Sequence, residues 1–190
     1  MSRDWLAADR SDLAAERILD AAAQLFSDRG VAAVGMADVA KAAGCSRATL
    51  YRYFDNRQAL QVAFVHREAR RVGAAVRADI ADIDDPGERI VAAISAALAR
   101  VRADRTIVAW FRSDNAGVAT ELAKSSAVIE GFAAAFVSQL GIADADLPAV
   151  SRWLIRVIVS LLAMPGRDTA EERAMLEQFV VPAVLARVTT

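Results

Sequence analysis

The chain has 190 residues, 55% of them hydrophobic and 25% charged, a composition too apolar for a disordered protein. It contains 43 alanines but only nine glycines and four prolines, which favours an all-helical fold. One cysteine, Cys45, excludes an internal disulfide, and a single histidine, His66, leaves no Cys/His metal cage. No apolar run reaches the roughly 18 to 20 residues of a membrane span, and no signal peptide is recognisable. We therefore expect a cytoplasmic protein without a membrane segment, a metal or another cofactor.

The net charge of −1 hides an uneven distribution of charged side chains. Residues 41–77 hold eight Lys and Arg side chains against two acids, whereas the segments on either side have an excess of acids. A basic block of this kind is either a solvated helix face or the contact surface for a polyanion. The motif inside the block decides between the two.

Three short helices and the start of a fourth are predicted after an irregular arm over residues 1–12. Gly30 and Gly44 end the first and second helices, because glycine readily adopts the left-handed conformation that follows a helix. Ser46 and Asn56 are suitable N-caps for the third and fourth helices. The predicted helices cover residues 13–29, 36–43, 47–54 and 57 to beyond 72.

The rest of the chain is predicted to form longer helices with brief breaks. Asp85, Pro86 and Glu88 give a strong start signal, with an N-cap acid, a proline at the first helical position and an acid at the third. Pro165 ends another helix, and Pro182 predicts a kink in the last one. No segment alternates with period two, so no strand is expected. The predicted segments cover residues 86–101, 107–111, 118–140, 147–163 and 169–188.

The segment from Val39 to Leu50 has the parts of a helix-turn-helix, namely small residues for close packing, a glycine turn and a capping serine. In its second helix Leu50 and Phe54 lie four residues apart and face inward. The opposite face can then lie in a DNA major groove, although helix-turn-helix units also occur as purely structural hairpins. The residues that this arrangement exposes are Arg47, Ala48, Thr49, Arg52 and Tyr53.

Arg57 strengthens the DNA-binding interpretation. As the first residue after the Asn56 cap, it places a cation at the positive end of a helix, where the helix dipole disfavours it. A bound phosphate would reverse this effect, because helix N-termini bind anions and the guanidinium adds a charge-assisted contact. Arg17, Lys41 and Arg52 could supply further contacts to the DNA backbone, although each of them alone is better explained as a solvated side chain.

These motifs resemble the TetR family of bacterial transcriptional repressors over residues 13–60. The resemblance implies that Arg47, Ala48 and Thr49 face base edges. It also implies that Tyr51, Tyr53 and Arg57 hold phosphates and that the protein is a homodimer. Three residues depart from the family pattern: Gly35, Cys45 and Arg57 stand where Thr or Ser, Val and Lys are frequent. The matching segments are Arg17–Phe26 with Gly30, Val39-Ala40, Ala43-Gly44, and Ser46–Phe54 with Arg57 and Leu60.

Residues 61–190 match the family only in the number and length of helices. We therefore expect a helix-turn-helix domain over residues 1–60 and an effector-binding and dimerisation domain over residues 61–190. The segment 153–162 is apolar around nearly its whole circumference. A fully internal helix would explain this, but in so short a chain we favour core on one side and a partner subunit on the other. The predicted interface residues are Trp153, Leu154, Val157, Ile158, Leu161, Leu176, Phe179, Val180 and Val184.

Aromatic residues recur at helical spacing in the middle of the chain. Most of them would fit an ordinary core, but any of them could instead line a cavity for a small apolar effector. The sequence does not reveal which compound that is. The candidate effector-pocket residues are Phe64, Trp110, Phe111, Phe132 and Phe136.

The sequence therefore predicts an all-α, ligand-responsive regulator that binds double-stranded DNA as a homodimer. We expect a repressor that a small apolar effector releases from a palindromic operator. The alternatives are a helical enzyme or a protein-interaction module with a structural helix-turn-helix. Against an enzyme, the chain has no Ser/His/Asp set, no phosphate-binding loop and no HExxH motif.

Overall fold

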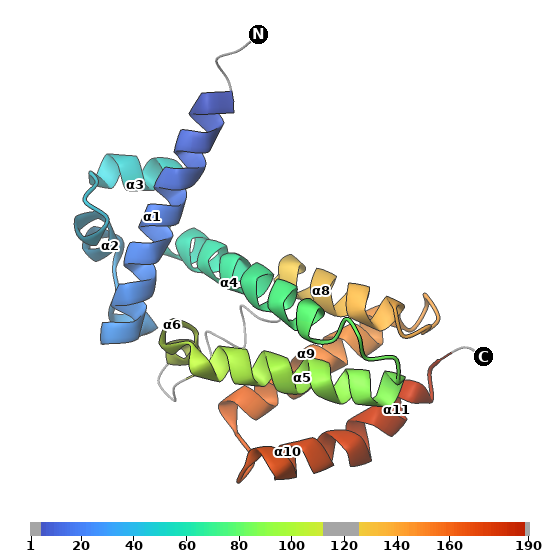
Figure 1. The fold of residues 1–190 in the computed structure, drawn as a ribbon. Coiled ribbons are helices and arrows are strands. Elements are labelled where there is room, and N and C mark those ends of the chain that lie inside the picture. The colour runs from blue at the N-terminus through green and yellow to red at the C-terminus, as the bar shows by residue number, and fades with distance from the viewer. Residues whose placement is uncertain (1–4, 112–125, 189–190) are drawn as a thin grey trace. The chain divides into compact units, whose positions relative to one another are not determined.

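A computed structural model of the chain describes residues 5–111 and 126–188 (Figure 1). All regular elements in these two stretches are helical, apart from one isolated antiparallel bridge between Ile142 and Val188. The all-α prediction is thereby confirmed. The chain forms two compact units, Met1–Val65 and His66–Thr190. In neither described stretch is there a helix with the length and apolar character needed to cross a membrane.

The N-terminal unit is built from α1, α2, α3 and the first part of α4. Helix α1 begins at Trp5 and not at the predicted residue 13. The early start has a simple cause: residues 5–12 lack an amphipathic pattern but contain Leu, Ala and Arg, which are strong helix formers. The elements are α1 (Trp5–Arg29), η1 (Val31–Ala33), α2 (Met36–Ala42), α3 (Arg47–Tyr53) and α4 (Arg57–Asp79).

The core of this unit forms along one face of α1. Ile18, Ala22 and Phe26 recur at helical spacing and are almost completely buried. Phe26 packs edge-to-face against Phe64 of α4, with ring centroids 5.5 Å apart and an interplanar angle of 82°. Gly30 follows α1 with φ +79°, which allows the chain to turn sharply into η1. Helix α1 contacts η1 and α2, and α2 in turn contacts α3.

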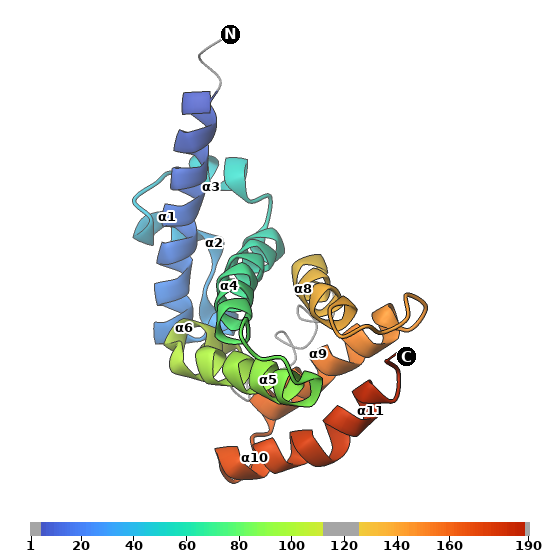
Figure 2. The ribbon, with the colours of Figure 1, turned by 45° about the vertical axis from the view of Figure 1, so that its right-hand side comes forward.

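The C-terminal unit contains the remaining helices. Asp85 caps α5 as predicted, since its Oδ1 accepts a hydrogen bond from the Glu88 backbone N–H at 2.7 Å. In both ribbon views α8 runs beside α9, and α11 lies beside α5 (Figures 1 and 2). The elements are α5 (Pro86–Ala103), α6 (Arg105–Val108), η2 (Ala109–Phe111), α8 (Ala127–Ser138), α9 (Leu147–Ala163), α10 (Thr169–Met175), η3 (Leu176–Val180) and α11 (Val181–Leu185).

Two predicted helices of this unit differ from the structure. The first part of the helix predicted over 118–140 lies outside the described residues, and α8 begins only at Ala127. Ser126 starts α8 because its Oγ accepts the Ile129 N–H at 3.2 Å. The last predicted helix, 169–188, is interrupted by η3, a π-helical turn directly before α11. Pro182 has no N–H and cannot donate the regular hydrogen bond of an α-helix. The helix is therefore irregular next to this residue, as a π-helical turn instead of the simple kink that was predicted.

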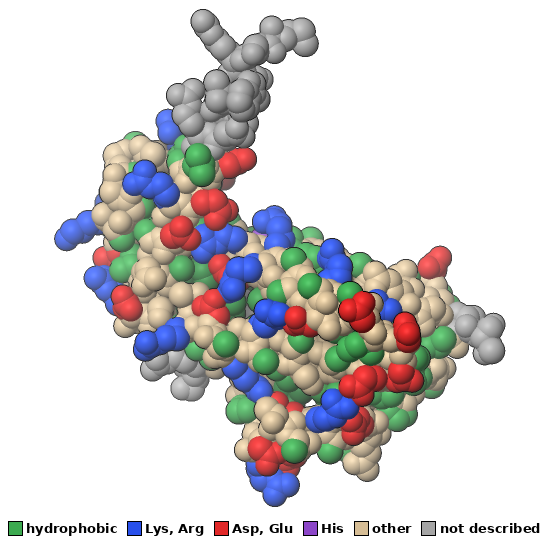
Figure 3. Space-filling model, in the orientation of Figure 1, with side chains coloured by type: hydrophobic (Ala, Val, Ile, Leu, Met, Phe, Trp, Pro, Cys, Tyr) green, Lys and Arg blue, Asp and Glu red, His purple; other side chains and the backbone are tan. Residues whose placement is uncertain are grey.

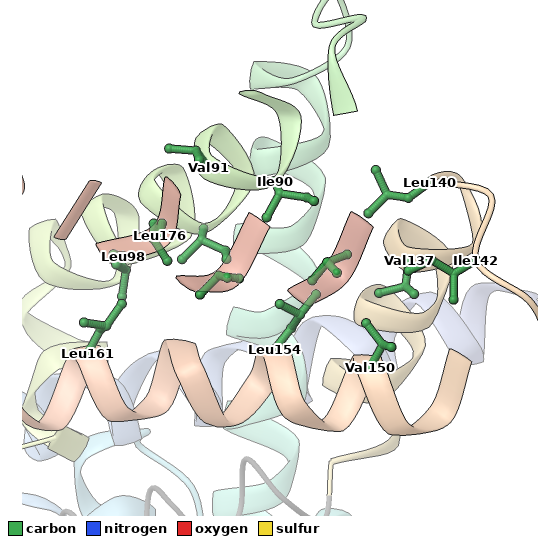
Figure 4. Close-up of a cluster of buried hydrophobic side chains, with 13 residues drawn as sticks. Ile90, Val91, Leu98, Val137, Leu140, Ile142, Val150, Leu154, Leu161 and Leu176 are labelled. Carbon is green, nitrogen blue, oxygen red and sulfur yellow. The ribbon is translucent and has the colours of Figure 1, made fainter. Parts of the chain in front are cut away.

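The core of the C-terminal unit lies between α5, α8, α9 and the α10–α11 segment (Figure 4). Ile90 of α5, Val137 of α8, Leu154 of α9 and Leu176 of η3 are at most 3% exposed. These residues come from positions up to 86 apart in the chain, so the core ties together the beginning and the end of the unit. This apolar cluster is the main stabilising element of the unit.

Candidate DNA-binding site

The turn between α2 and α3 has the geometry that the sequence predicts. Gly44 has φ +66°, a left-handed conformation that a residue with a Cβ adopts only at a cost. The Cys45 N–H then donates a hydrogen bond to the Ala40 carbonyl at 3.0 Å. Ser46 Oγ accepts the Thr49 N–H at 3.0 Å and caps α3. These bonds fix where α3 begins.

Helix α3 presents a polar face opposite its buried side. Leu50 and Phe54 are buried, whereas Arg47, Ala48 and Arg52 are exposed. The Thr49 hydroxyl is only 2.9 Å from Ser46 Oγ, so this side chain is engaged at the cap. The outward face of α3 therefore consists of two arginines, a small residue and one tyrosine, namely Arg47, Ala48, Tyr51 and Arg52.

The tyrosines of α3 differ in exposure. Tyr51 is an exposed aromatic side chain, while Tyr53 is half-buried. The Arg52 guanidinium lies 5.3 Å from the centroid of the Tyr53 ring, within cation–π distance. Arg17 on α1 and Lys41 on α2 are exposed as well. Figure 3 shows several Lys and Arg side chains over the α2–α3 region of this unit.

Helix α2 begins without the hydroxyl cap that the resemblance would supply. Gly35 has no side chain that could accept a hydrogen bond from the first turn of α2. Instead, the Asp38 carboxylate accepts the Gly35 N–H at 3.0 Å. Arg29 at the end of α1 lies 3.5 Å from the same carboxylate. Asp38 thus supplies one half of a capping box at the start of α2, and the half that a hydroxyl at position 35 would supply is missing.

Arg57 has an intramolecular role that the sequence did not indicate. Its Nη2 donates to the Val31 carbonyl at 2.6 Å and to the Ala32 carbonyl at 2.8 Å. These bonds tie the start of α4 to η1, 26 residues earlier in the chain. This contact joins residues about 25 positions apart in the chain, so the sequence pattern near Arg57 does not show it. The predicted phosphate contact of Arg57 would have to use Nη1, because Nη2 is bonded to the two carbonyls and Nε is buried.

Most residues predicted for a dimer interface belong to the core of the C-terminal unit. Helix α9 is packed against both α5 and α8, which accounts for much of its apolar circumference. Phe179 is the exception, with 60% of its surface exposed. Three others, Trp153, Val157 and Ile158, are half-buried against this core. The fully buried ones are Leu154, Leu161, Leu176, Val180 and Val184.

The residues predicted for an effector pocket are distributed over several environments. Phe64 is 1% exposed and belongs to the core of the N-terminal unit, because it lies on the part of α4 that packs against α1. Phe132 of α8 lies directly over Gly73 of α4, where an added Cβ would be 3.0 Å from the ring. Phe136 packs against the apolar cluster of the C-terminal unit. At η2, Trp110 is buried and Phe111 half-buried.

Comparison with known proteins supports the family resemblance of the N-terminal unit and extends it over the chain. Residues 18–64 match the family model described as bacterial regulatory proteins, tetR family. The HTH-type transcriptional regulator Rv1255c of Mycobacterium tuberculosis is 50% identical over 182 residues, which cover 95% of this chain and 90% of that protein.

Two solved structures show the same fold. The TetR family repressor AlkX from a Dietzia strain is 24% identical, with a TM-score of 0.69 over 91% of this chain and 96% of the other. FadR of Thermus thermophilus, a repressor solved in complex with lauroyl-CoA, is 22% identical, with a TM-score of 0.62 over 93% and 95% of the two chains. The similarity covers the C-terminal helices as well as the helix-turn-helix. The C-terminal unit of this chain therefore has the fold of the corresponding part of these two proteins.

Proposed function

The chain belongs to the TetR family of bacterial regulatory proteins and is a transcriptional regulator, not an enzyme, and from this premise we propose that it is a dimeric repressor of a palindromic operator. The observation that carries the proposal is the exposed face of α3. Arg47, Ala48 and Arg52 point away from the core, while Leu50 and Phe54 hold the helix from behind. A helix held in this way can enter a major groove with its arginines toward the DNA.

Within this proposal the exposed residues have different tasks. Arg47, Ala48 and Thr49, at the start of α3, face base edges, as recognition helices use their N-terminal residues for base contacts. Arg17, Lys41, Tyr51, Arg52, Tyr53 and Arg57 contact phosphates, which fix the register but carry no sequence information. Such binding takes place on bacterial chromosomal DNA, so the proposed location of the protein is the cytoplasm.

The proposed dimer brings two copies of α3 to one operator. Phe179 of η3 and Met175 of α10 are large apolar side chains that are 60% and 43% exposed and lie four residues apart. Exposed apolar side chains at this spacing suit a contact with the same face of a second copy. The domain boundary expected at residue 60 stays part of the proposal, with α4 continuing from the DNA-binding part into the C-terminal unit.

The proposed effector is a small apolar compound that binds the C-terminal unit. Its support is the fold shared with FadR of T. thermophilus, which holds lauroyl-CoA, a molecule with an apolar acyl chain. Trp110, Phe111, Phe132 and Phe136 remain the aromatic candidates for this site. An effector that binds the DNA-free form 100-fold better than the DNA-bound form would supply about 2.7 kcal/mol of coupling, enough to empty an operator held near half-saturation.

Selection of bound sequences from random duplex DNA tests the proposal directly. We expect an inverted repeat, with half-sites about one helical turn, roughly 34 to 36 Å, or a simple multiple apart. Salt-dependent but unselective retention would indicate DNA binding without an operator. A selected site without inverted symmetry would contradict the dimer.

The effector is tested separately by screening apolar compounds for a rise in the melting temperature and then for release of the selected operator. Linkage requires that DNA weakens effector binding by the same factor. A compound that stabilises the protein but leaves operator affinity unchanged is not an effector.

A further inference from the structure

A hollow in the C-terminal unit lies between α4 and the junction of α5 with α6. Its volume is about 410 Å³, within the range of roughly 300 to 1,000 Å³ typical of small-molecule sites. The part of α4 that lines it follows His66, so the whole hollow belongs to one compact unit. Its lining residues are Arg71, Val72, Ala75, Arg100, Ala103, Asp104, Arg105 and Thr106.

Two of the three arginines in this hollow are already neutralised. Arg100 makes a bidentate pair with Asp79, with contacts of 2.6 to 2.9 Å. Arg71 donates its Nε to Glu68 at 2.8 Å and its Nη2 to Asp104. Each of these cations therefore has a carboxylate at close range.

The acid next to Arg105 is fully occupied by other donors. Asp104 Oδ1 accepts both the N–H and the hydroxyl of Thr106, at 2.9 and 2.6 Å, and thereby caps α6. Asp104 Oδ2 accepts from Arg71. Among the residues that the structure describes, Arg105 has no ion pair and no side-chain hydrogen bond. Arg105 is thus the one lining arginine without a carboxylate partner among the described residues.

We infer that this hollow binds a small organic anion through Arg105 and Arg71. A guanidinium presents a planar fork of N–H donors that matches the oxygens of a carboxylate or a phosphate. Arg71 uses Nε and Nη2 for its two acids, which leaves Nη1 as the donor that the ligand would engage. Val72, Ala75 and Ala103 supply an apolar wall, which favours an anion with an apolar body over an inorganic ion.

An anion in this site would compete with Asp104 for Arg71. The contact between Arg71 and Asp104 links α4 to the start of α6, and α4 is the helix that continues into the DNA-binding unit. Figure 3 shows Lys and Arg side chains interspersed with Asp and Glu side chains over α4 and α5. Calling the bound anion an effector rests on the proposed function, whereas its binding to Arg105 does not.

Isothermal titration calorimetry of the full chain without DNA tests the site with three probes: octanoate, octyl phosphate and the uncharged octan-1-ol. We expect the anions to bind more tightly than octan-1-ol, and the tighter of the two anions identifies the headgroup. Arg105→Gln should weaken anion binding at least about tenfold, since a charge-assisted contact is lost. The matched control is Arg70→Gln, an exposed arginine on α4 outside the hollow, which should leave the affinity unchanged.

The anion site would be refuted if octan-1-ol bound as tightly as the two anions. It would also be refuted if Arg105→Gln and Arg70→Gln changed anion affinity equally. Operator affinity of the same proteins is measured independently. If octanoate weakens operator binding in the wild type but not in Arg105→Gln, the site is regulatory; if it weakens neither, the effector role is excluded. If no operator were selected from random DNA, the proposed function would be refuted. The calorimetry would still show whether the anion site exists.

Discussion

Arg47 and Arg57 lie ten residues apart in the same basic block but differ in what they contact. Arg47 is exposed on α3, and it has no intramolecular ion pair or hydrogen bond of its side chain within the described part of the chain. Arg57 is half-buried, with Nη2 bonded to two backbone carbonyls. A substitution at Arg47 should therefore act on DNA alone, whereas one at Arg57 should also act on the fold.

We expect Arg47→Ala to weaken binding to the selected operator by roughly 1 to 3 kcal/mol, because a base contact is lost, and to change nonspecific binding much less. Arg52→Ala, at a proposed phosphate contact, should weaken both kinds of binding alike. Fluorescence anisotropy titrations with operator and unrelated DNA measure both affinities. If Arg47→Ala lowered the two affinities equally, Arg47 would be a backbone contact.

Arg57→Gln should lower the free energy of unfolding by about 1 to 3 kcal/mol, since two carbonyls lose a charged donor. Urea denaturation measures this loss. The control is Arg47→Gln, which should stay within about 0.5 kcal/mol of the wild type because the side chain is solvated. Unchanged stability together with weaker binding to every DNA would show that Arg57 acts only through phosphates.

Among the elements, the turn from α9 to α10 is held by a buried ion pair. Glu172 of α10 accepts two bonds from Arg102 of α5, both at 2.7 Å, and a third from the Gly166 N–H at 2.8 Å. Arg102 also donates to the Leu161 carbonyl near the end of α9 at 2.9 Å. The hydrogen bonds from Arg102 outweigh the burial of Glu172 and hold the pKa of this carboxyl below its ordinary value of 4.5.

This pair should make stability depend on pH in acid. Because the pKa of Glu172 is lower in the folded than in the unfolded protein, its contribution is complete above pH 4.5 and is lost as the pH falls through the folded pKa. Glu172→Gln should cost about 1 to 3 kcal/mol at pH 7. The difference from the wild type should shrink in acid, as urea denaturation at several pH values would show.

Glu177→Gln is the matched control for this prediction. Glu177 pairs with Arg173 on the same segment, but both side chains are about half exposed, and such surface pairs contribute about 0 to 1 kcal/mol. A pH-independent effect of Glu172→Gln would mean that the carboxylate charge is not what holds the turn.

The element boundaries show what a sequence can and cannot predict. Gly44, Ser46 and Asp85 act through bonds to residues at most four positions away, so local pattern was enough to place α3 and α5. Ser126 was missed as the cap of α8 because the apolar pattern continues on both sides of it. The π-helical turn before Pro182 depends on packing of the whole segment, which local pattern does not specify.

Site residues were harder to predict wherever their role depends on distant parts of the chain. Periodicity showed that Phe64 and Leu154 would be buried, but it could not show against what. Phe64 packs on Phe26 in the N-terminal unit, and Leu154 joins the cluster in Figure 4. Helix electrostatics predicted a phosphate contact for Arg57. Its hydrogen bonds to η1 could not be predicted, because they join segments far apart in the sequence. The exposed face of α3 was predictable because it follows from one helix alone.

For the molecule as a whole, the proposed dimer surface has to be separated from the core beneath it. A charge at Leu176 or Val180 would be buried and would unfold the C-terminal unit whatever the assembly. Phe179, 60% exposed, can carry a charge without that cost in a single subunit. It is therefore the position at which assembly and folding can be tested independently.

We expect Phe179→Glu to give a folded monomer, because two copies of the new carboxylate would meet or be desolvated in the interface. Analytical ultracentrifugation measures the assembly, and circular dichroism checks that helix content is unchanged. Leu13→Glu is the control, since Leu13 is a similarly exposed apolar residue, 66% exposed, on α1. A Phe179→Glu dimer of normal affinity would place the interface elsewhere.

The same variant links assembly to DNA recognition. A dimer binds the second half-site as an intramolecular event, which raises overall affinity by about 10² to 10⁴-fold over a single half-site. Phe179→Glu leaves α3 untouched, so its affinity for an isolated half-site should equal that of a wild-type subunit. Its affinity for the full operator should fall by at least about 100-fold. Titration of wild type and variant against full and half operators distinguishes lost assembly from a damaged α3, since damage to α3 would weaken binding to both.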